Sequence, residues 1–295
     1  MPNRSCRLSL TPGAPEAMWR LWVALTLACL GTAAVARAGE ASLATTADEV
    51  IQRNIVARGG LAAWQKVDTL VYLGHLERAN AKDAARVPFV MQLKRPNMTR
   101  FEVKEQYEQY TRIFDGRHGW RIRPGADGHP QTSGFSPAEV AFARTEYVVD
   151  GPLVDYRQKG VTAELDGIDR LDDGRRAYRL SLKLPGGVPR KVWVDVKTNL
   201  DVRYDRPATS PLAPGKPVTV YYGDFRSENG IQVPHSIETT AEAGHAVSQL
   251  ADKLVIERVL VNPKLDELAF TPPARPLRQG NAGAYVRIPG PGASP

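Results

Sequence analysis

The chain is poor in cysteine. Among its 295 residues only Cys6 and Cys29 are cysteines, and both lie in the first 38 positions. If that segment is removed, as its composition predicts, the remaining 257 residues have no cysteine, which excludes disulfides and thiolate ligands. Small exported proteins often depend on disulfides because they bury too little apolar surface. A chain of 257 residues can bury a large core without them.

Short motifs of common catalytic and cofactor sites are also missing. There is no H-E-x-x-H, C-x-x-C, P-loop, G-x-G-x-x-G or G-x-S-x-G pattern. No two of the five histidines (His75, His118, His129, His235 and His245) are two or four positions apart, so none forms a local metal-binding pair. We therefore predict no catalytic residues, no metal site and no cofactor. An enzyme would require scattered histidines and carboxylates to converge in the fold.

Charge of one sign is not concentrated in any block. The whole chain has 39 basic and 32 acidic residues, and its first 38 positions hold four arginines and one glutamate. The rest therefore has 35 basic and 31 acidic residues, a net charge of +4. This mild and dispersed excess does not indicate a nucleic-acid partner.

The first 38 residues have the three parts of a secretory signal peptide. Arg4, Arg7 and Arg20 precede the uncharged run LWVALTLACLGTAAVA, and Ala36 and Ala38 form an A-x-A cleavage site. The run is short for a membrane-spanning helix, which needs about 20 apolar residues. We predict cleavage after Ala38 and a periplasmic mature protein; the alternative is an uncleaved anchor.

The domain expected after the signal peptide covers residues 39–271. Residues 272–295 are rich in Pro, Gly and Ala and show no periodicity, which predicts a disordered tail. Within the domain, capping-box patterns at Thr46–Glu49 and Ser136–Glu139 predict the starts of two helices. Elsewhere apolar residues alternate with polar ones, which is typical of half-buried strands. Asn229-Gly230 suits a type I′ hairpin turn.

About eleven such strands follow one another with short turns. They predict a mainly β fold, a curved antiparallel half-barrel with helices covering its concave face. The alternation supplies twelve candidates for lining an apolar cavity on one face: Leu70, Tyr72, Phe89, Met91, Phe101, Val103, Tyr110, Trp120, Tyr178, Leu180, Val192 and Val194. The alternative is that these side chains are ordinary core under the helices.

The segment FDGRHGW, residues 114–120, places an aspartate, an arginine and a histidine within four positions. Its neighbours are strand-like on both sides, so the chain must reverse here, and Gly116 and Gly119 suit a turn. We interpret the segment as a hairpin with an exposed polar tip. Trp120 then begins the returning strand and is a candidate wall of the cavity.

Six segments in order resemble bacterial outer-membrane lipoprotein-sorting-like proteins of the LolA/LolB-like superfamily: IQRNIVARGGLAAWQKVDTL, KRPNMTRFE, FDGRHGW, DGPLVDYRQKG, GDFRSENGIQVPHSIE and VNPKLDELAFTPP. The resemblance covers nearly all of the mature chain. It implies a periplasmic protein whose half-barrel encloses a hydrophobic cavity for lipid or lipoprotein acyl chains. It implies no enzymatic activity. Relatives of the same fold include envelope-stress sensors, so recognition of a membrane-associated protein partner is the alternative function.

Overall fold

The structure is a computed structural model that describes residues 42–78, 86–105, 108–146, 148–187, 189–207, 217–241 and 252–272. The predicted signal peptide and, apart from Pro272, the predicted tail lie outside these residues. The chain divides into Met1–Leu43 and Ala44–Pro295, and every element described below belongs to the second unit. None of the described helices is long and apolar enough to cross a membrane.

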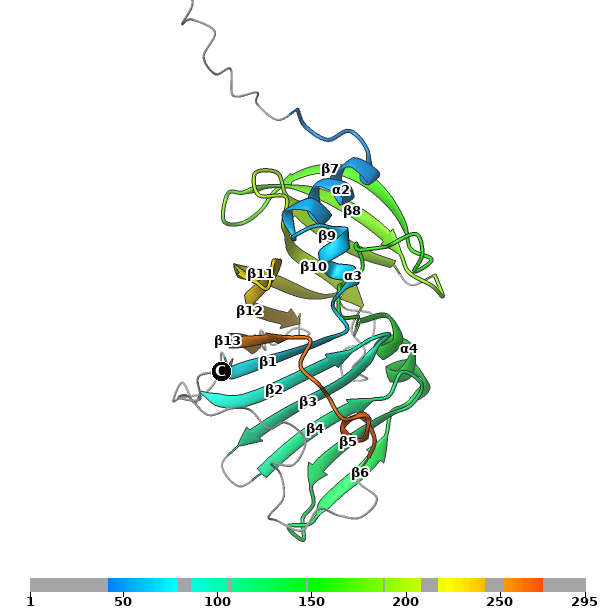
Figure 1. The fold of residues 1–295 in the computed structure, drawn as a ribbon, viewed down its shortest axis with the longest axis vertical. Coiled ribbons are helices and arrows are strands. Elements are labelled where there is room, and N and C mark those ends of the chain that lie inside the picture. Colours follow the sequence, from blue (N-terminus) through cyan, green and yellow to red (C-terminus); the bar gives the residue numbers. More distant parts are fainter. Residues whose placement is uncertain are drawn as a thin grey trace, which may run out of the picture. The chain divides into compact units, whose positions relative to one another are not determined.

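The second unit is built on one antiparallel sheet of thirteen strands that is not closed into a barrel (Figure 1). The strands are β1 (Thr69–Arg78), β2 (Val87–Lys94), β3 (Met98–Glu105), β4 (Glu108–Phe114), β5 (Gly119–Pro124), β6 (Pro130–Gly134), β7 (Thr162–Arg170), β8 (Arg176–Lys183), β9 (Pro189–Asp195), β10 (Asp201–Pro207), β11 (Pro217–Glu228), β12 (Ile231–Ala241) and β13 (Asp252–Val261). Their order is β6-β5-β4-β3-β2-β1-β13-β12-β11-β10-β9-β8-β7, so every pairing joins strands that are consecutive in sequence except that of β1 with β13, and β6 and β7 form the two edges.

The predicted fold class is confirmed, with thirteen strands where about eleven were expected. β6 shows why a strand is hard to recognise from its sequence. Its residues, PQTSG, include no alternating apolar side chain, and four of the five are exposed. β6 forms an edge of the sheet and neither of its faces is buried, so the periodic signal of a buried face is missing.

The described part of the chain has three α-helices on the concave face of the sheet: α2 (Ala47–Ala57), α3 (Leu61–Gln65) and α4 (Pro137–Glu146). The N-cap hydrogen bond of each predicted capping box forms, and the reciprocal bond from the N-cap amide to the glutamate forms at Ser136–Glu139, whereas Glu49 accepts from the amide of Thr45. The Thr46 hydroxyl accepts from the amide of Glu49 at 3.2 Å, and the Ser136 hydroxyl accepts from the amide of Glu139 at 3.3 Å. Each helix therefore starts where the sequence predicted.

The end of α2 docks against the turn between β11 and β12. Asn229 and Gly230 in that turn both have positive φ, 49° and 85°, as a type I′ turn requires. The carbonyl of Arg58 accepts from the amide of Gln232 at 2.9 Å. A Cβ on Gly59, whose φ is +108°, would lie 2.2 Å from the carbonyl oxygen of Gly230. Only glycine therefore fits this contact.

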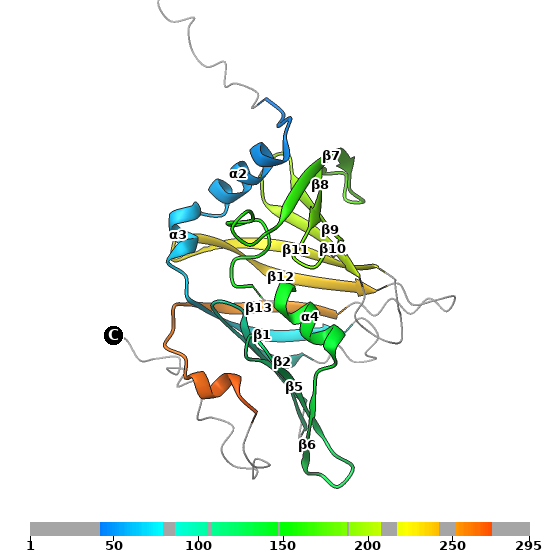
Figure 2. The same cartoon turned by 90° about the vertical axis from the view of Figure 1, so that its right-hand side faces the viewer.

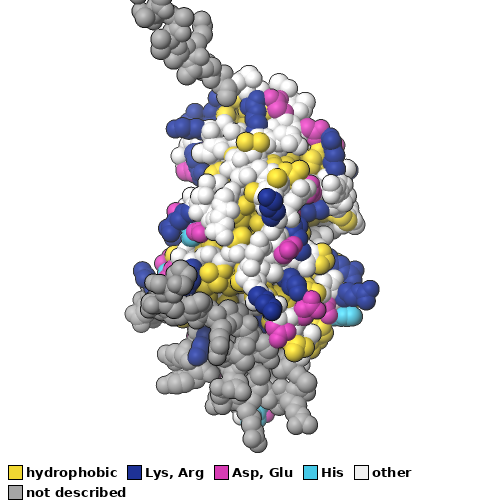
Figure 3. Space-filling model, viewed as in Figure 1, with side chains coloured by type: hydrophobic (Ala, Val, Ile, Leu, Met, Phe, Trp, Pro, Cys, Tyr) yellow, Lys and Arg dark blue, Asp and Glu magenta, His cyan; other side chains and the backbone are white. Residues whose placement is uncertain are grey.

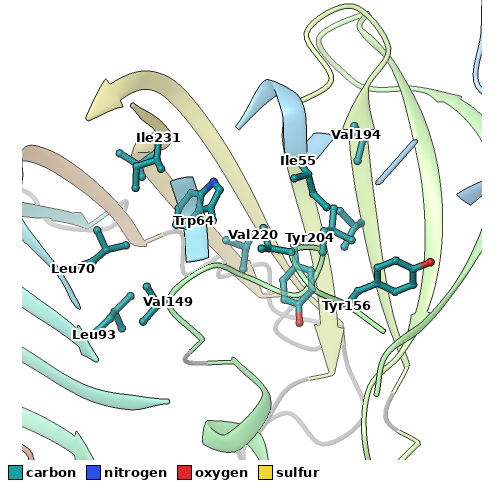
Figure 4. Packing of buried hydrophobic residues seen from close by; sticks show 14 of the residues in the cluster. Ile55, Trp64, Leu70, Leu93, Val149, Tyr156, Val194, Tyr204, Val220 and Ile231 are labelled. Carbon is teal, nitrogen blue, oxygen red and sulfur yellow. The ribbon is translucent and has the colours of Figure 1, made fainter. Parts of the chain in front are cut away.

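The main core lies on the concave face, where α2, α3 and residues 148–161 pack onto the sheet. Figure 4 shows Ile55 from α2 and Trp64 from α3 among side chains of the strands. A second core lies on the opposite face, where the 3₁₀ helix η1 (Glu267–Phe270) packs over Val71, Ile113 and Ile122. Figure 2 shows η1 and α4 on opposite sides of the sheet. The outer face of these strands, which the half-buried pattern predicts to be polar, is therefore covered in part by this second core.

Candidate functional site: a cavity on the concave face

A cavity of about 180 Å³, called here the concave-face cavity, lies between the sheet on one side and Glu146 and residues 148–153 on the other. Strands β1, β2, β9, β10, β11 and β12 form its floor, and the segment after α4 forms its roof. Its lining residues are Arg58, Tyr72, Met91, Leu93, Glu146, Val148, Val149, Gly151, Pro152, Leu153, Val192, Asp201, Tyr204, Tyr222, Pro234 and Ile237. The lining is mostly apolar, with tyrosines and a few charged groups at its margins.

The roof, residues 148–161, carries Val149 and Leu153 into the main core, and both are buried. Figure 4 shows Val149 facing Leu70 and Leu93 of the sheet. The segment reads DGPLVDYRQKG in its middle, where glycine and proline oppose regular structure. Its backbone forms turns, with the amides of Gly151, Lys159, Gly160 and Val161 donating to carbonyls within the segment, and side chains tie these turns to the rest of the domain.

Asp150 ties the roof to the rest of the domain. Its fully buried carboxylate accepts from Arg95 at 2.9 Å and from Lys159. The Lys159 ammonium also donates to the carbonyls of Gly151 and Val154, at 2.7 and 2.6 Å. Burial lowers the pKa of Lys159, although the nearby Asp150 carboxylate opposes this effect. The roof is thus held by a buried ionic cluster in addition to its apolar contacts.

Arg58 borders the cavity at the end of α2, with its guanidinium stacked 4.4 Å from the centre of the Trp64 ring. It donates to the backbone carbonyl of Asp150 at 2.9 Å and lies 3.7 Å from the carboxylate of Asp201. This places a cation between the roof and β10. Because its partners surround it, Arg58 positions the roof and fixes one margin of the cavity.

The opposite margin is a second charged cluster around Glu146, at the end of α4. Arg190 donates to the Glu146 carboxylate and to the Tyr204 hydroxyl, each at 2.8 Å, and Tyr204 donates to Glu146 at 2.8 Å. Arg206 lies 3.8 Å from the same carboxylate. The Arg190 side chain is only 2% exposed, so this cluster is shielded from water. Its mutual pairing is what makes such burial tolerable.

Three tyrosines of the lining keep their protons. Burial raises the pKa of Tyr72 to about 12, and it also raises the pKa of Tyr204 and of Tyr222. In Figure 4 the Tyr204 hydroxyl points away from Ile55. At neutral pH these side chains present rings and neutral hydroxyl groups to the cavity. Within the described residues, no group of three His, Cys, Asp or Glu side chains could hold a metal ion.

The structure brings together ten of the twelve predicted lining residues in or against the main core: Leu70, Tyr72, Phe89, Met91, Phe101, Val103, Tyr178, Leu180, Val192 and Val194. Of these, Tyr72, Met91 and Val192 line the concave-face cavity. The other seven pack without bordering it. Tyr110 is 37% exposed, and its hydroxyl bonds to Glu108 at 2.7 Å, so it lies apart from the core.

Trp120 lies on the face opposite the main core, paired with Ile113 and packed in the second core. The expectation that it shares a face with Leu70 and Tyr72 is wrong. The reason is the strand register. Trp120 pairs with Ile113, and Ile113 pairs with Arg100 on β3. Arg100 pairs in turn with Gln92 on β2, and Gln92 with Val71 on β1, so Trp120 shares the face of Val71. A displacement of one residue in any strand reverses the faces of all its side chains.

The FDGRHGW segment is a hairpin turn, as predicted, between β4 and β5. The Asp115 carboxylate accepts from the amides of Arg117 and His118 at 2.7 and 2.6 Å. The His118 side chain is 72% exposed. The aspartate therefore shapes the turn, and the histidine points into solvent at its tip.

Sequence reasoning missed most of the cavity lining. Tyr204 and Tyr222 lie on β10 and β11, where apolar and polar side chains alternate, so this period-two pattern could have identified them. Arg58, Glu146 and the roof had no such signal, because they come from helix ends and an irregular segment. Their position depends on how distant parts of the chain pack.

No protein-family model matches the chain, and no curated protein matches it. Solved structures do match. A LolA superfamily protein from Nitrosomonas europaea is 15% identical, with a TM-score of 0.51 over 78% of this chain and 99% of that one. An outer membrane lipoprotein-sorting protein domain from Vibrio parahaemolyticus is 9% identical, with a TM-score of 0.49 over 75% and 94% of the two chains.

The MucA/MucB complex of Pseudomonas aeruginosa also matches, at 10% identity and a TM-score of 0.20, over 72% of this chain and 91% of that one. Identities this low compare folds and not functions. The predicted resemblance to LolA superfamily proteins is confirmed at the level of the fold.

Proposed function

We propose that this chain is an exported binding or carrier protein for an apolar ligand, and that an acyl chain, such as that of a lipoprotein, occupies the concave-face cavity. The observation that carries the proposal is the cavity itself, bordered by Tyr72, Met91 and Val192 on the face that the sequence pattern had singled out. The LolA-superfamily fold and the predicted signal peptide are consistent with it.

The energetics of such a ligand favour an apolar cavity with few fixed anchors. An acyl chain in water costs about 0.8 kcal/mol for each CH₂ group, and an apolar lining offsets that cost without fixing the ligand's orientation. A thioether such as that of Met91 adapts to different shapes. Tightly placed polar groups would instead slow the release that a carrier requires.

The size of the cavity sets a condition on binding. Pockets that enclose drug-sized ligands have volumes of roughly 300–1,000 Å³, whereas this cavity has about 180 Å³. In the conformation described here it can hold only part of a long chain. The roof carries Val149, Pro152 and Leu153 across the cavity, so its displacement would enlarge the apolar space. We propose that a complete acyl chain enters as the roof moves outward.

A matched pair of substitutions tests the proposal. Met91→Trp should fill the cavity and lower the affinity for a fluorescent fatty acid by about tenfold, because the cavity then loses room for about two CH₂ groups. Displacement of the bound fluorescent fatty acid measures the change. Met98→Trp is the control, because Met98 packs in the second core on the opposite face. Thermal unfolding of both variants establishes that they fold.

Native mass spectrometry of the protein gently extracted from the periplasm supplies a second measurement, and it should show a bound lipid. If wild-type protein carries no lipid and binds no fatty acid, the proposal fails. Retention of a membrane-associated protein in the same preparation would then favour the alternative, a sensor or scaffold that recognises a protein partner. Equal weakening by both tryptophan substitutions would place the binding site elsewhere.

A further inference from the structure

Three tyrosines line the concave-face cavity, and their hydroxyl groups differ in their partners. The Tyr204 hydroxyl is committed to its cluster, since it donates to Glu146 and accepts from Arg190, each at 2.8 Å. The hydroxyl groups of Tyr72 and Tyr222 form no hydrogen bond with any residue that the structure describes. Neither oxygen is fully enclosed by protein atoms, so each one reaches open space. The lining thus carries two hydroxyl groups that are available to a ligand.

Both hydroxyl groups are neutral donors in apolar surroundings. Burial raises the pKa of Tyr72 to about 12 and also raises the pKa of Tyr222, so each keeps its proton at neutral pH. Tyr72 pairs with Met91 across β1 and β2, and Tyr222 pairs with Ile237 across β11 and β12; both neighbours line the cavity. Each hydroxyl group can therefore donate one hydrogen bond into a space that is otherwise mostly apolar.

Arg58 adds positive charge near both donors. Its Nη1 group donates to the backbone carbonyl of Asp150 at 2.9 Å, and no hydrogen bond joins its Nη2 group to the described residues. The charge of Arg58 opposes the effect of burial on the pKa of Tyr72 and of Tyr222, so it acts on both hydroxyl groups. An electron-rich oxygen beside these hydroxyl groups is therefore favoured.

Nearby carboxylates indicate that this oxygen belongs to a neutral group. Asp201 lies 3.7 Å from Arg58 and partly neutralises it, and both Asp201 and Glu146 raise the pKa of Tyr222. The same two carboxylates would repel a full negative charge beside Tyr222. On the face seen in Figure 3, Lys, Arg, Asp and Glu side chains are interspersed, so that face offers no block of one sign that would select ligands by charge.

An ester carbonyl complements donors of this kind. Its oxygen accepts up to two hydrogen bonds, and it carries no charge. A ligand without such an oxygen would displace water from the hydroxyl groups without replacing its hydrogen bonds, which lowers the affinity. Each neutral hydrogen bond contributes about two- to tenfold in affinity, so such bonds select a ligand and still permit its release.

We infer that the concave-face cavity binds the ester carbonyl of its ligand, with the hydroxyl groups of Tyr72 and Tyr222 as donors. The inference rests on the proposed function, which it extends by naming the ligand as an acyl ester. The cavity then receives the end of the chain that bears the carbonyl group, together with the CH₂ groups next to it. Esters are preferred over chains of equal length that lack a carbonyl group.

The test compares methyl dodecanoate with methyl dodecyl ether, which differ only in the carbonyl oxygen. Each displaces diphenylhexatriene, an uncharged fluorescent hydrocarbon that accepts no such bond. Wild-type protein should prefer the ester. In the Tyr72→Phe/Tyr222→Phe variant this preference should fall by about two- to tenfold for each hydroxyl group that donates. The ratio of the two affinities is the readout, because a change in apolar fit affects both ligands alike.

The control variant is Tyr110→Phe, which removes a hydroxyl group from an exposed residue outside the cavity lining. It should keep the preference of the wild-type protein. Thermal unfolding establishes that both variants fold, as expected when phenylalanine retains the ring. Arg58 is left unchanged, because its substitution would also release the backbone carbonyl of Asp150 in the roof. An equal loss of preference in the control variant would overturn the inference.

The outcomes separate the two proposals. If the ester and the ether bind wild-type protein equally, the proposed function stands and the carbonyl inference fails. If neither ligand binds, the proposed function fails as well. If wild-type protein prefers the ester and the Tyr72→Phe/Tyr222→Phe variant keeps that preference in full, other groups bind the carbonyl and the inference is again overturned.

Discussion

The two faces of strands β1–β5 are covered in different ways. On the outer face, residues 262–270 complete a small core with Leu265, Ala269 and Phe270, all of them buried. On the concave face, the roof covers the sheet but leaves the cavity beneath it. Residues 262–270 pack against the outer face, whereas the roof encloses a cavity against the concave face.

The polar contacts of the two covers differ accordingly. Arg100 fixes the outer cover by donating to the backbone carbonyl of Ala269 at 2.9 Å. The roof instead depends on Asp150, with Arg95 and Lys159 as its partners. A segment that leaves a cavity gives up apolar contacts, so charge pairs contribute more of what holds it. The comparison teaches that the roof is held by buried charge pairs as well as by its apolar contacts with the main core.

The largest expected effect comes from Phe270, which is 1% exposed in the second core. Phe270→Ala should lower the free energy of unfolding by about 3–5 kcal/mol, because it removes a buried ring and leaves a void. Urea unfolding measures the loss. Fatty-acid affinity should stay unchanged at temperatures where the variant is folded. A change in affinity as large as that of Met91→Trp would show that the two faces are coupled.

Asp150→Asn sharpens the comparison on the concave face. The substitution leaves Lys159 and Arg95 without their carboxylate, and should cost about 3 kcal/mol, the lower end for breaking a buried pair, since both cations keep some contact with water. Hydrogen exchange should accelerate in residues 148–161 and remain unchanged in residues 262–270. Asp173→Asn, at an exposed ion pair, is the control and should cost less than about 1 kcal/mol. Equal exchange in both segments would contradict a separately held roof.

Much of the fold follows from local patterns in the sequence. Alternation predicted the strands, capping boxes predicted the starts of α2 and α4, and Asn229-Gly230 predicted a hairpin turn. Each of these depends on interactions within a few residues, which a single sequence records. The same patterns identified the concave face of β1, β2, β3, β8 and β9.

The cavity could not be predicted to the same degree, for physical reasons. A lining residue and a packed residue on one face carry the same alternating signal, so Met91 and Phe89 look alike in sequence. The ionic clusters join positions far apart in the chain, such as Arg95 with Asp150 and Glu146 with Arg190. Trp120 was placed on the wrong face because register across five strands, β1 to β5, was not available from any one of them.

The smallest expected effect distinguishes the two faces by pH. Tyr72, Tyr204 and Tyr222 line the concave-face cavity, and burial raises the pKa of all three. The folded protein therefore holds these protons more tightly than the unfolded chain does, and unfolding releases them above pH 10. The stability contributed by the neutral hydroxyl groups is fully present below about pH 10 and falls as pH rises toward the folded pKa, which is about 12 for Tyr72.

Tyr72→Phe should remove up to about 1.4 kcal/mol per pH unit from that slope. Urea unfolding at pH 9, 10 and 11 measures it, with the exposed Tyr110→Phe as control. An unchanged slope in Tyr72→Phe would mean that Tyr72 ionises freely in the folded protein, and that the concave-face cavity is as open to water as the outer surface.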